Sequence, residues 1–389
     1  MKPGKNKYRF PWRSGNTFQL LIDGRQFYPC MLDAINEAKS FICLESYLIK
    51  SGKITDRFIE AFIKAQNRGV MVYIFLDDYG SRELTDKDRQ QFVNSGIHIT
   101  IFNPIRLFRF FRSLQRNHRK LLLVDGSIGF IGGSGITDEF LPGEIPDNSW
   151  HEVMVRIEGA VLHDWLELFS HSWHKASRSP TKLPVLNLPE QMDKSMGRLS
   201  IAEGYRQEIN RSLIKRCRNA EQQIFISTPY FIISIKLRRV LRKAARQGID
   251  VRVLVPGKIS DHPWVSHASR GYYTRLLRAG VRIFEYQPRF IHAKIQLCDN
   301  WVSIGSSNLD RWNQHWNLDA NQEIEDTVFS QEVRRLFEHN FKQSNEILYS
   351  NWKIRPRRQR LKEWFYGRFV HVLEYLSRLK TRQKKEKGE

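Results

Sequence analysis

Hydrophobic positions along the chain recur in an order that is used twice. In the first half, the apolar run Phe41–Ile49 precedes a helical pattern over Phe58–Gly69 and a second apolar run over Val70–Asp78. A glycine-led apolar run follows at Gly96–Pro104, and then the segment Asn117–Gly126. Short runs rich in β-branched and apolar residues predict buried strands, whereas apolar residues three and four apart predict a helix. The first half therefore predicts alternating strands and a helix.

The second half repeats this order of five segments. They are, along the chain, Ile224–Ile232, Leu237–Gly248, Ile249–Gly257, Gly280–Pro288 and Ile291–Asn300. Gly69 and Gly248 end the corresponding helices, as expected of a C-terminal cap before a strand. Repetition of the whole order favours an internal duplication over two unrelated α/β domains. We therefore predict an α/β fold with two similar lobes, each an α/β sandwich.

A polar, proline-containing segment separates the two repeats. It lies within Ser177–Arg198, and residues of this kind mark loops and domain boundaries. The expected domains are a basic N-terminal segment (1–15), a first lobe (16–180), a linker (181–198), a second lobe (199–350) and a basic amphipathic tail (351–389).

Composition narrows the classes of protein that fit this pattern. The 389 residues, of which 41% are hydrophobic, suffice for two lobes with a core. A total of 63 Lys and Arg against 41 Asp and Glu gives a net charge of +22, which favours a polyanionic partner. Nucleic acid, an anionic membrane and a phosphorylated substrate all meet that description. A basic surface that serves only solubility is the alternative.

Cysteine usage and apolar run lengths bear on the compartment. Four scattered cysteines argue against a disulfide framework or a zinc site and suit a reducing compartment: Cys30, Cys43, Cys217 and Cys298. The basic start of the chain is not followed by the apolar core of a signal peptide. The longest apolar stretches are too short to span a bilayer. We expect a cytoplasmic protein, or one on the cytoplasmic face of a membrane.

Each half contains the motif His-x-Lys-x4-Asp. The two copies are His118, Lys120 and Asp125, and His292, Lys294 and Asp299. In a strand, positions i and i+2 point to the same face, so the histidine and lysine of each copy project together. An ammonium attracts phosphate oxygens, and an imidazole can act as nucleophile, acid or base. The aspartate falls on the opposite face, so we predict that it braces the motif rather than touching substrate.

A single copy of this motif would be weak, because a lone strand histidine is more often structural. Two copies at equivalent places in a repeat favour a function, since duplicated lobes can bring both copies to one interface. The motifs therefore predict one site for phosphodiester chemistry, built from both halves.

The paired motif resembles that of the phospholipase D superfamily, over about residues 16–345. Within the superfamily the chain is most similar to bacterial cardiolipin synthases, especially the B-type enzymes without transmembrane helices. Three further stretches carry the resemblance: Trp150–Trp173, the run SIGSSNLD (Ser303–Asp310) and Trp316–Ile324. It implies two α/β/α sandwich lobes related by pseudo-twofold symmetry, with the active site at the lobe interface.

The resemblance also implies a two-step mechanism without a cofactor or metal. One histidine attacks phosphorus to form a phosphohistidine ester, and the other protonates the leaving alcohol and then deprotonates the acceptor. By family analogy, His118 is the nucleophile and His292 the acid and base. Lys120 and Lys294, with Ser306 and Asn308, would stabilise charge on the phosphate oxygens.

Family motif positions also suggest a carboxylate for each histidine. Glu152 is expected to orient His118, and Asp319 to orient His292. The family more often has Asp at the first position and Glu at the second. A further departure is Gly135, which stands where the first small-residue turn usually carries asparagine.

Two segments favour a lipid substrate. The loop 106–116, which precedes the first motif, mixes arginine with phenylalanine and can insert rings between lipids, or can simply cover the cleft. The tail carries an apolar stripe at helical spacing: Leu361, Phe365, Phe369, Val372, Leu376 and Leu379. From Arg355 to Glu389, 12 Lys and Arg against four Glu give a charge of +8. A basic amphipathic helix on an anionic membrane is the expected reading; a helix packed on the lobes is the alternative.

Three functions remain open on the sequence. The first is cardiolipin synthase-like phosphatidyl transfer, in which two phosphatidylglycerols give cardiolipin and glycerol. The second is hydrolysis of phospholipid or nucleic acid at the same site. The third is an inactive basic scaffold that binds membrane or nucleic acid, against which the intact motifs count. We expect a peripheral membrane protein that is active as a monomer, because one chain carries both motifs.

Overall fold

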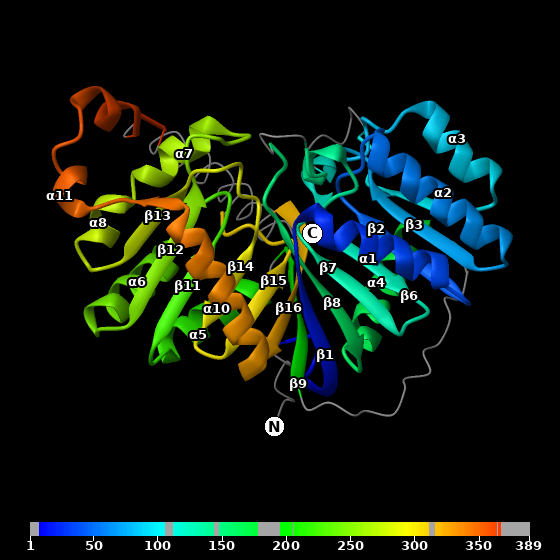
Figure 1. Ribbon diagram of the computed structural model, residues 1–389, viewed down its shortest axis with the longest axis horizontal. Coiled ribbons are helices and arrows are strands. Elements are labelled where there is room, and N and C mark those ends of the chain that lie inside the picture. The colour runs from blue at the N-terminus through cyan, green and yellow to red at the C-terminus, as the bar shows by residue number, and fades with distance from the viewer. Residues whose placement is uncertain are drawn as a thin grey trace, which may run out of the picture.

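The computed structural model describes residues 8–105, 112–143, 148–177, 195–204, 206–310, 316–363 and 365–366. Figure 1 shows two α/β halves side by side. The N-terminal strand β1 (Arg13–Ile22) and the strand β9 (Ser195–Glu203) run between the two halves. The protein therefore has the mixed α/β fold that the segment order predicts.

The first half contains β1 to β8 and α1 to α4. Its strands are β1 (Arg13–Ile22), β2 (Phe41–Ser46), β3 (Met71–Asp77), β4 (His98–Phe102), β5 (Arg116–Asn117), β6 (Lys120–Val124), β7 (Ile128–Gly132) and β8 (Val153–Gly159). Its helices are α1 (Asp23–Glu37), α2 (Lys53–Asn67), α3 (Asp86–Asn94) and α4 (Leu162–Ser177), with short 3-10 turns at Arg112–Leu114 and Asp138–Phe140.

The second half runs from β9 to the end of the described chain. Its strands are β9 (Ser195–Glu203), β10 (Arg206–Gln207), β11 (Gln223–Ser227), β12 (Asp250–Pro256), β13 (Arg282–Tyr286), β14 (Ile295–Cys298), β15 (Trp301–Gly305), β16 (Asn317–Glu325) and β17 (Ser344–Glu346). Its helices are α5 (Glu208–Asn219), α6 (Ile235–Arg246), α7 (Pro263–Arg270), α8 (Tyr273–Leu277), α10 (Thr327–Lys342) and α11 (Tyr349–Trp352).

Strand pairing repeats in the two halves. The first half has the order β4-β3-β2-β6-β7-β8-β1, in which the first two pairs are parallel and the rest antiparallel. The second half has the order β13-β12-β11-β14-β15-β16-β9 with the same directions. Each predicted apolar run lies on the expected strand. Gly69 and Gly248 follow α2 and α6 with positive φ, which confirms both as helix ends.

The two halves share one sheet. β1 pairs with β9 at Arg13↔Gly197 and Asn16↔Ser195, so hydrogen bonding runs from one half into the other. This pairing joins the two lobes, because the innermost strand of each half would otherwise expose an unpaired edge. The predicted segment 1–15 contains the start of β1, and the predicted linker 181–198 contains the start of β9.

Three apolar clusters cover the faces of this sheet. One cluster lies under α1 and α2, and another under α5, α6 and α8. The third joins both halves, because α4 and α10 place Trp165, Phe169 and Phe337 on the same side of the sheet. Within the described residues, no helix is both long and apolar enough to cross a membrane.

Candidate active site

Both histidine motifs begin where the chain crosses to the opposite half. β5, directly before His118, pairs in parallel with the start of β16, and His118 N donates to Leu318 O at 3.0 Å. In the second half, Ile291 forms a parallel bridge with His151, and His292 N donates to His151 O at 2.8 Å. The backbone of each half therefore fixes the catalytic segment of the other.

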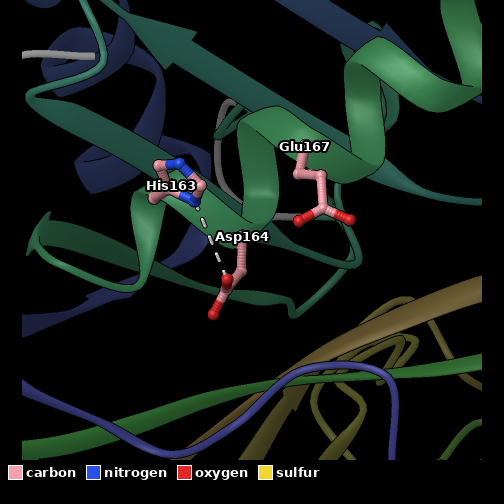
Figure 2. A group of neighbouring side chains, drawn as sticks. All are labelled: His163, Asp164 and Glu167. Atoms are coloured by element: carbon pink, nitrogen blue, oxygen red, sulfur yellow. Dashed lines mark ion pairs between the residues drawn. The ribbon is translucent and has the colours of Figure 1, made fainter. Parts of the chain in front are cut away.

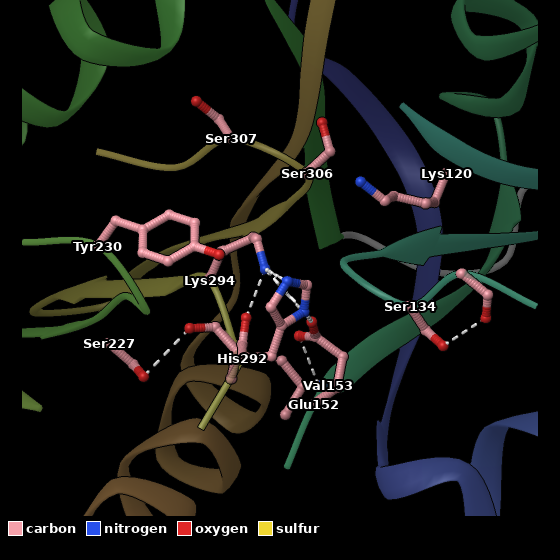
Figure 3. A network of polar contacts seen from close by, with 12 residues as sticks. Lys120, Ser134, Glu152, Val153, Ser227, Tyr230, His292, Lys294, Ser306 and Ser307 are labelled. Atoms are coloured by element: carbon pink, nitrogen blue, oxygen red, sulfur yellow. Dashed lines mark hydrogen bonds and ion pairs between the residues drawn. The ribbon is translucent and has the colours of Figure 1, made fainter. Parts of the chain in front are cut away.

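Each histidine contacts a carboxylate from the other half. His118 Nδ1 lies 2.9 Å from Asp319 Oδ1, and His292 Nδ1 lies 2.6 Å from Glu152 Oε2. The expected pairing, Glu152 with His118 and Asp319 with His292, is wrong. The reason is that the segment before each histidine pairs with the other half, so each histidine lies beside the carboxylate of that half. The order of the motifs along the chain does not show this. Figure 3 shows His292 beside Glu152.

The carboxylates determine which ring nitrogen carries hydrogen. An ionised carboxylate only accepts, so Nδ1 of each ring donates and Nε2 keeps its lone pair. The nearby lysine and imidazole groups in turn lower the pKa values of both carboxyl groups. Although burial opposes ionisation of Glu152, the charges of Lys294 and His292 lower its pKa. Burial likewise opposes ionisation of Asp319, and its hydrogen bond with His118 is the main influence that lowers its pKa. Both carboxyl groups are therefore ionised at neutral pH.

The two motif lysines are buried beside the histidines. Lys120 Nζ donates to His118 O at 2.7 Å and lies 5.1 Å from the centre of the Tyr47 ring. Lys294 Nζ donates to His292 O at 2.5 Å and lies 2.9 and 3.0 Å from the two ring nitrogens of His292. The predicted projection of each His–Lys pair to one face is confirmed by these contacts.

The imidazoles are held neutral. Burial is the main cause that lowers the pKa of His118 to about 4, and the Lys120 ammonium adds to it. Burial and then Lys294 lower the pKa of His292 to about 4. Burial lowers the lysine pKa values as well. Lys294 Nζ lies 3.5 Å from Glu152 Oε2, and a bound phosphate anion would further stabilise the charged form of both lysines, so the site is suited to receive an anion.

One cavity of about 780 Å³ contains both histidines. It is lined by His118, Lys120 and Trp150 from the first half and by His292, Asn308 and Tyr230 from the second, among others. The spatial requirement of the sequence argument, a common cavity for both rings, is met. A cavity with two neutral imidazoles, Lys120 in its lining and Lys294 beside His292 can bind a phosphate group and exchange its ester partners.

The motif aspartates lie away from the cavity. Asp125 accepts hydrogen bonds from the backbone N–H groups of Lys39, Ser40 and Phe41, at 2.8 to 2.9 Å. Asp299 does the same for residues 221, 222 and 223, at 2.9 to 3.0 Å. Both aspartates have positive φ. The predicted bracing role is confirmed: each carboxylate ties the hairpin after the motif to the start of the neighbouring strand.

The small-residue turns differ between the halves. Ser306 Oγ donates to Asp319 Oδ1 at 2.7 Å, whereas the equivalent Gly133 faces the Glu152 carboxylate so closely that an added Cβ would clash with it. Asn308 lines the cavity, as a phosphate ligand would. A Cβ at the equivalent Gly135 would clash with the backbone of Leu48, which explains why no asparagine stands there. Phosphate binding by Ser306 and Asn308 stays a prediction.

A polar network supports Glu152 from behind. Asp23, which has positive φ, accepts from His151 Nδ1 at 2.8 Å and from Glu152 N at 3.1 Å, and Arg289 of the second half also donates to it. His151 Nε2 lies 3.0 Å from Asn340 Nδ2 on α10. These contacts join both halves next to the orienting carboxylate, and sequence reasoning missed them because no motif marks Asp23.

A second cluster of acidic and imidazole groups lies outside the lining of this cavity. His163, Asp164 and Glu167 gather at the start of α4, where their ligand atoms lie within 4.8 Å of one another (Figure 2). Asp164 is bound by Arg13 through two hydrogen bonds of 2.7 Å, and Glu167 pairs with Arg9. Arginine therefore occupies the carboxylates that an ion would need.

Several cavity residues were not predicted as site residues from the sequence. Tyr47 lies edge-on to His118, with ring centres 4.8 Å apart, and Trp150 lies 5.1 Å from His292. Tyr230 and Asp261 line the second-half side. The run after each first strand, with a tyrosine in both halves, was the signal available for Tyr47 and Tyr230.

The segments proposed for membrane contact are only partly described. Residues 106–111 and the tail beyond residue 366 lie outside the described residues. Of the predicted stripe, Leu361 is 67% and Phe365 59% exposed. On the cavity rim, Ile105 and Trp264 are also exposed apolar residues.

Known proteins resemble this chain along most of its length. It matches the family described as "Cardiolipin synthase, PLD-like domain" over residues 31–173 and 213–341. It is 32% identical to cardiolipin synthase A of Pseudomonas putida, over 91% of this chain and 74% of that protein. The major cardiolipin synthase of Bacillus subtilis (strain 168) is also 32% identical, over 90% and 73% of the two chains. Cardiolipin synthase B of Shigella flexneri is 32% identical, over 83% and 80%.

Solved structures show the same fold at lower identity. The crystal structure of phosphatidylserine synthase from Haemophilus influenzae Rd KW20 superposes with a TM-score of 0.71 at 14% identity, covering 96% of each chain. Polyphosphate kinase from Porphyromonas gingivalis gives a TM-score of 0.54 at 15% identity, over 83% of this chain and 50% of that one. These likenesses concern the fold alone.

Proposed function

Since the chain belongs to the cardiolipin synthase family of phospholipase D-like proteins, we propose that it transfers a phosphatidyl group from one phosphatidylglycerol to another. The products are cardiolipin and glycerol. The observation that carries this proposal is the shared cavity, in which two neutral imidazoles lie beside two lysines and each imidazole has its own carboxylate.

The reaction proceeds in two displacements. Nε2 of His118 attacks phosphorus, the bond from phosphorus to the glycerol oxygen breaks, and protonated His292 gives its proton to that oxygen. His292, now neutral, takes the proton of an acceptor hydroxyl as that oxygen attacks phosphorus and the phosphorus–nitrogen bond breaks. Each displacement breaks one bond to phosphorus and forms another. After the second displacement His118 is free again and His292 is protonated again, as at the start.

Two contacts support His118 as the nucleophile. Lys294 Nζ lies 3.0 Å from Nε2 of His292, close to the lone pair that an attacking nitrogen needs. Lys120 Nζ also donates to the carbonyl oxygen of its motif histidine, but among the described residues it makes no hydrogen bond with the His118 ring. Lys120 and Lys294 then stabilise negative charge on the phosphate oxygens in both displacements.

The membrane is the proposed partner. A chain with net charge +22 is attracted to an anionic lipid surface, and exposed Leu361 and Phe365 begin the predicted amphipathic stripe. We place the protein on the cytoplasmic face as a peripheral membrane protein. A monomer suffices, because one chain supplies both histidines and both carboxylates.

The test is a lipid assay with a trapped intermediate. Purified full chain in phosphatidylglycerol vesicles is expected to form cardiolipin and an equal amount of free glycerol. The His118→Ala and His292→Ala variants should each lose at least a thousandfold in rate. After an acid quench of a working reaction, peptide mass spectrometry should find phosphatidyl on the His118 peptide. Phosphatidic acid as the sole product would show hydrolysis instead, and label on the His292 peptide would reverse the two roles.

A further inference from the structure

The cavity has two chemically different sides, although the halves repeat the same strand order. Among the described residues that line it, the first half contributes Arg116 and apolar groups such as Ile105, and no carboxylate. The second half contributes Asp261, Asp310 and Tyr230 on its side of the two histidines. A carboxylate beside a site for an anion costs binding energy unless it recognises another part of the substrate. This asymmetry indicates that the two sides of the cavity bind chemically different parts of the reacting molecules.

Asp261 and Tyr230 present hydrogen-bond acceptors. The Tyr230 hydroxyl donates to Asp261 Oδ2. Burial, and next the negative charge of Asp261, raise the pKa of Tyr230, so its hydroxyl keeps this hydrogen. With that hydrogen committed, the remaining lone pairs on both side chains can only accept. The Asp261 side chain is 18% exposed, so it is within reach of a ligand in the cavity.

Two rings in the cavity lining continue this acceptor surface. The His262 ring lies 5.7 Å from Tyr230 and 6.4 Å from Trp264, centre to centre. Trp264 is 40% exposed and lines the cavity. Rings beside hydroxyl-binding acceptors suit a polyol, because the C–H groups of the polyol can pack on the ring faces.

We propose that Asp261 and Tyr230 form the subsite for the alcohol, where they bind the hydroxyl next to the one that reacts. This inference rests on the proposed phosphatidyl transfer and names how its acceptor is chosen. The glycerol head of an acceptor phosphatidylglycerol has two neighbouring hydroxyls. One gives its proton to His292 and attacks phosphorus, and the other donates a hydrogen bond to Asp261. Water and simple alcohols have no second hydroxyl for this contact, so the subsite favours transfer to a polyol over hydrolysis.

The nearby lysines favour a hydroxyl over an ammonium at this subsite. A hydroxyl and an ammonium can both donate to these acceptors, but Lys120 in the cavity lining and Lys294 beside His292 already bring positive charge to the site. Asp261 acts on Lys294 across this space, since its charge is among those that raise the pKa of that lysine against the stronger effect of burial. A ligand ammonium would be repelled by these lysines, whereas a neutral hydroxyl is not. Figure 3 shows Tyr230 on the Lys294 side of the site.

The experiment measures how one intermediate is divided between two alcohols. Full chain in phosphatidylglycerol vesicles receives isotope-labelled glycerol and methanol together, and labelled phosphatidylglycerol and phosphatidylmethanol are quantified. Both products come from the same phosphohistidine, so any defect in the first displacement cancels from their ratio. Asp261→Asn should lower the glycerol-to-methanol product ratio roughly tenfold, the size of one hydrogen bond to a charged group. Tyr230→Phe should lower it in the same direction while keeping the ring.

Matched controls make the result decisive. Asp33→Asn removes the same charge from the exposed face of α1 and should leave the product ratio unchanged. An unchanged ratio in both Asp261→Asn and Tyr230→Phe overturns the subsite. If added ethanolamine displaces glycerol in the wild-type products, the subsite takes an ammonium and the hydroxyl assignment is wrong. If the wild type forms no lipid product at all, the proposed function fails and this inference fails with it.

Discussion

At the scale of single residues, the site depends on imidazoles that are neutral before substrate arrives. His118 and His292 are buried beside lysines, which lowers both pKa values to about 4. A phosphodiester brings one negative charge into the cavity, and an anion within a few ångströms raises the pKa of an imidazole. The substrate therefore helps His292 take up the proton that the first displacement needs, while His118 keeps the lone pair that attacks.

The pH dependence of the free enzyme should reveal these lowered pKa values. A histidine with a lowered pKa is neutral above that value, so the nucleophile is competent until the pH falls to about 4. Because the first displacement needs protonated His292, we expect kcat/KM for phosphatidylglycerol to rise as the pH falls from 7 to 5 and to fall below about pH 4, where His118 is protonated as well. Initial rates on vesicles at constant ionic strength measure this, with vesicle binding recorded at each pH. An acid limb near 6.5 would contradict the burial argument.

The two motifs and their lysines were predictable, whereas the partners of the histidines were not. His118 and Lys120 lie two positions apart in sequence, and alternation along a strand determines their common face. Asp319 lies 201 positions from His118, and its approach depends on how β5 pairs with β16. No local pattern encodes that pairing. Chain order suggested Glu152 instead, and the crossing of the two halves reversed the assignment.

At the scale of elements, the length of each carboxylate side chain matches the size of the residue that follows the neighbouring strand. Glu152 precedes β8 and its longer side chain occupies the space beside Gly133, which follows β7. Asp319 on β16 is shorter, and the Ser306 hydroxyl after β15 fills the remaining gap and donates to it at 2.7 Å. The exchange of Asp and Glu relative to the usual family pattern therefore has a packing counterpart in each half.

This match predicts a rescue between two positions. Glu152→Asp alone withdraws the carboxylate from His292 by about one bond length and should lower kcat by roughly a hundredfold. Adding Gly133→Ser supplies a hydroxyl in the vacated space and should recover at least tenfold of that loss. Gly133→Ser alone should be harmful, because its side chain clashes with the intact Glu152. Rates of cardiolipin formation for the three variants test this, and a double variant no faster than Glu152→Asp would contradict it.

The strand order was predictable, and the joining of the halves was not. The five repeated apolar and helical segments indicate equivalent strands in both halves, and the pairing orders bear this out. β1 and β9 lie outside the repeated segments, and each begins in a region assigned to a terminal segment or a linker and continues into a predicted lobe. Their pairing is determined by the edge that each half would leave open, which is a property of the assembled sheet.

At the scale of the whole molecule, charge and exposed apolar groups point to a lipid surface. Leu361 and Phe365 are exposed at the start of the tail, although Glu363 between them is buried and bound by Arg355. Tyr366 stacks on His267 of α7 with ring centres 5.5 Å apart, so the described start of the tail is anchored on the second half while these two apolar side chains are exposed. This arrangement suits an interfacial helix, with the anchored side toward the protein and the apolar side chains toward lipid.

Removing these two side chains should weaken membrane binding without unfolding the protein. Leu361→Ser with Phe365→Ser is expected to reduce binding to phosphatidylglycerol vesicles at least tenfold, because both lose apolar area for insertion. Vesicle flotation measures the binding, and thermal unfolding checks stability. The control Val328→Ser changes an equally exposed apolar residue on α10, outside the predicted stripe, and should bind normally. Unchanged flotation of the double variant would discard the interfacial helix.

The crossed contacts between histidine and carboxylate also limit how this protein can change over evolutionary time. His118 depends on Asp319, and His292 on Glu152, so neither repeat holds a complete catalytic unit of its own. A chimera that keeps this first half and takes a second half with a longer carboxylate would disturb the histidine of the unaltered part. The two repeats must therefore evolve together, because a substitution at either carboxylate is selected for its effect on the histidine of the opposite repeat.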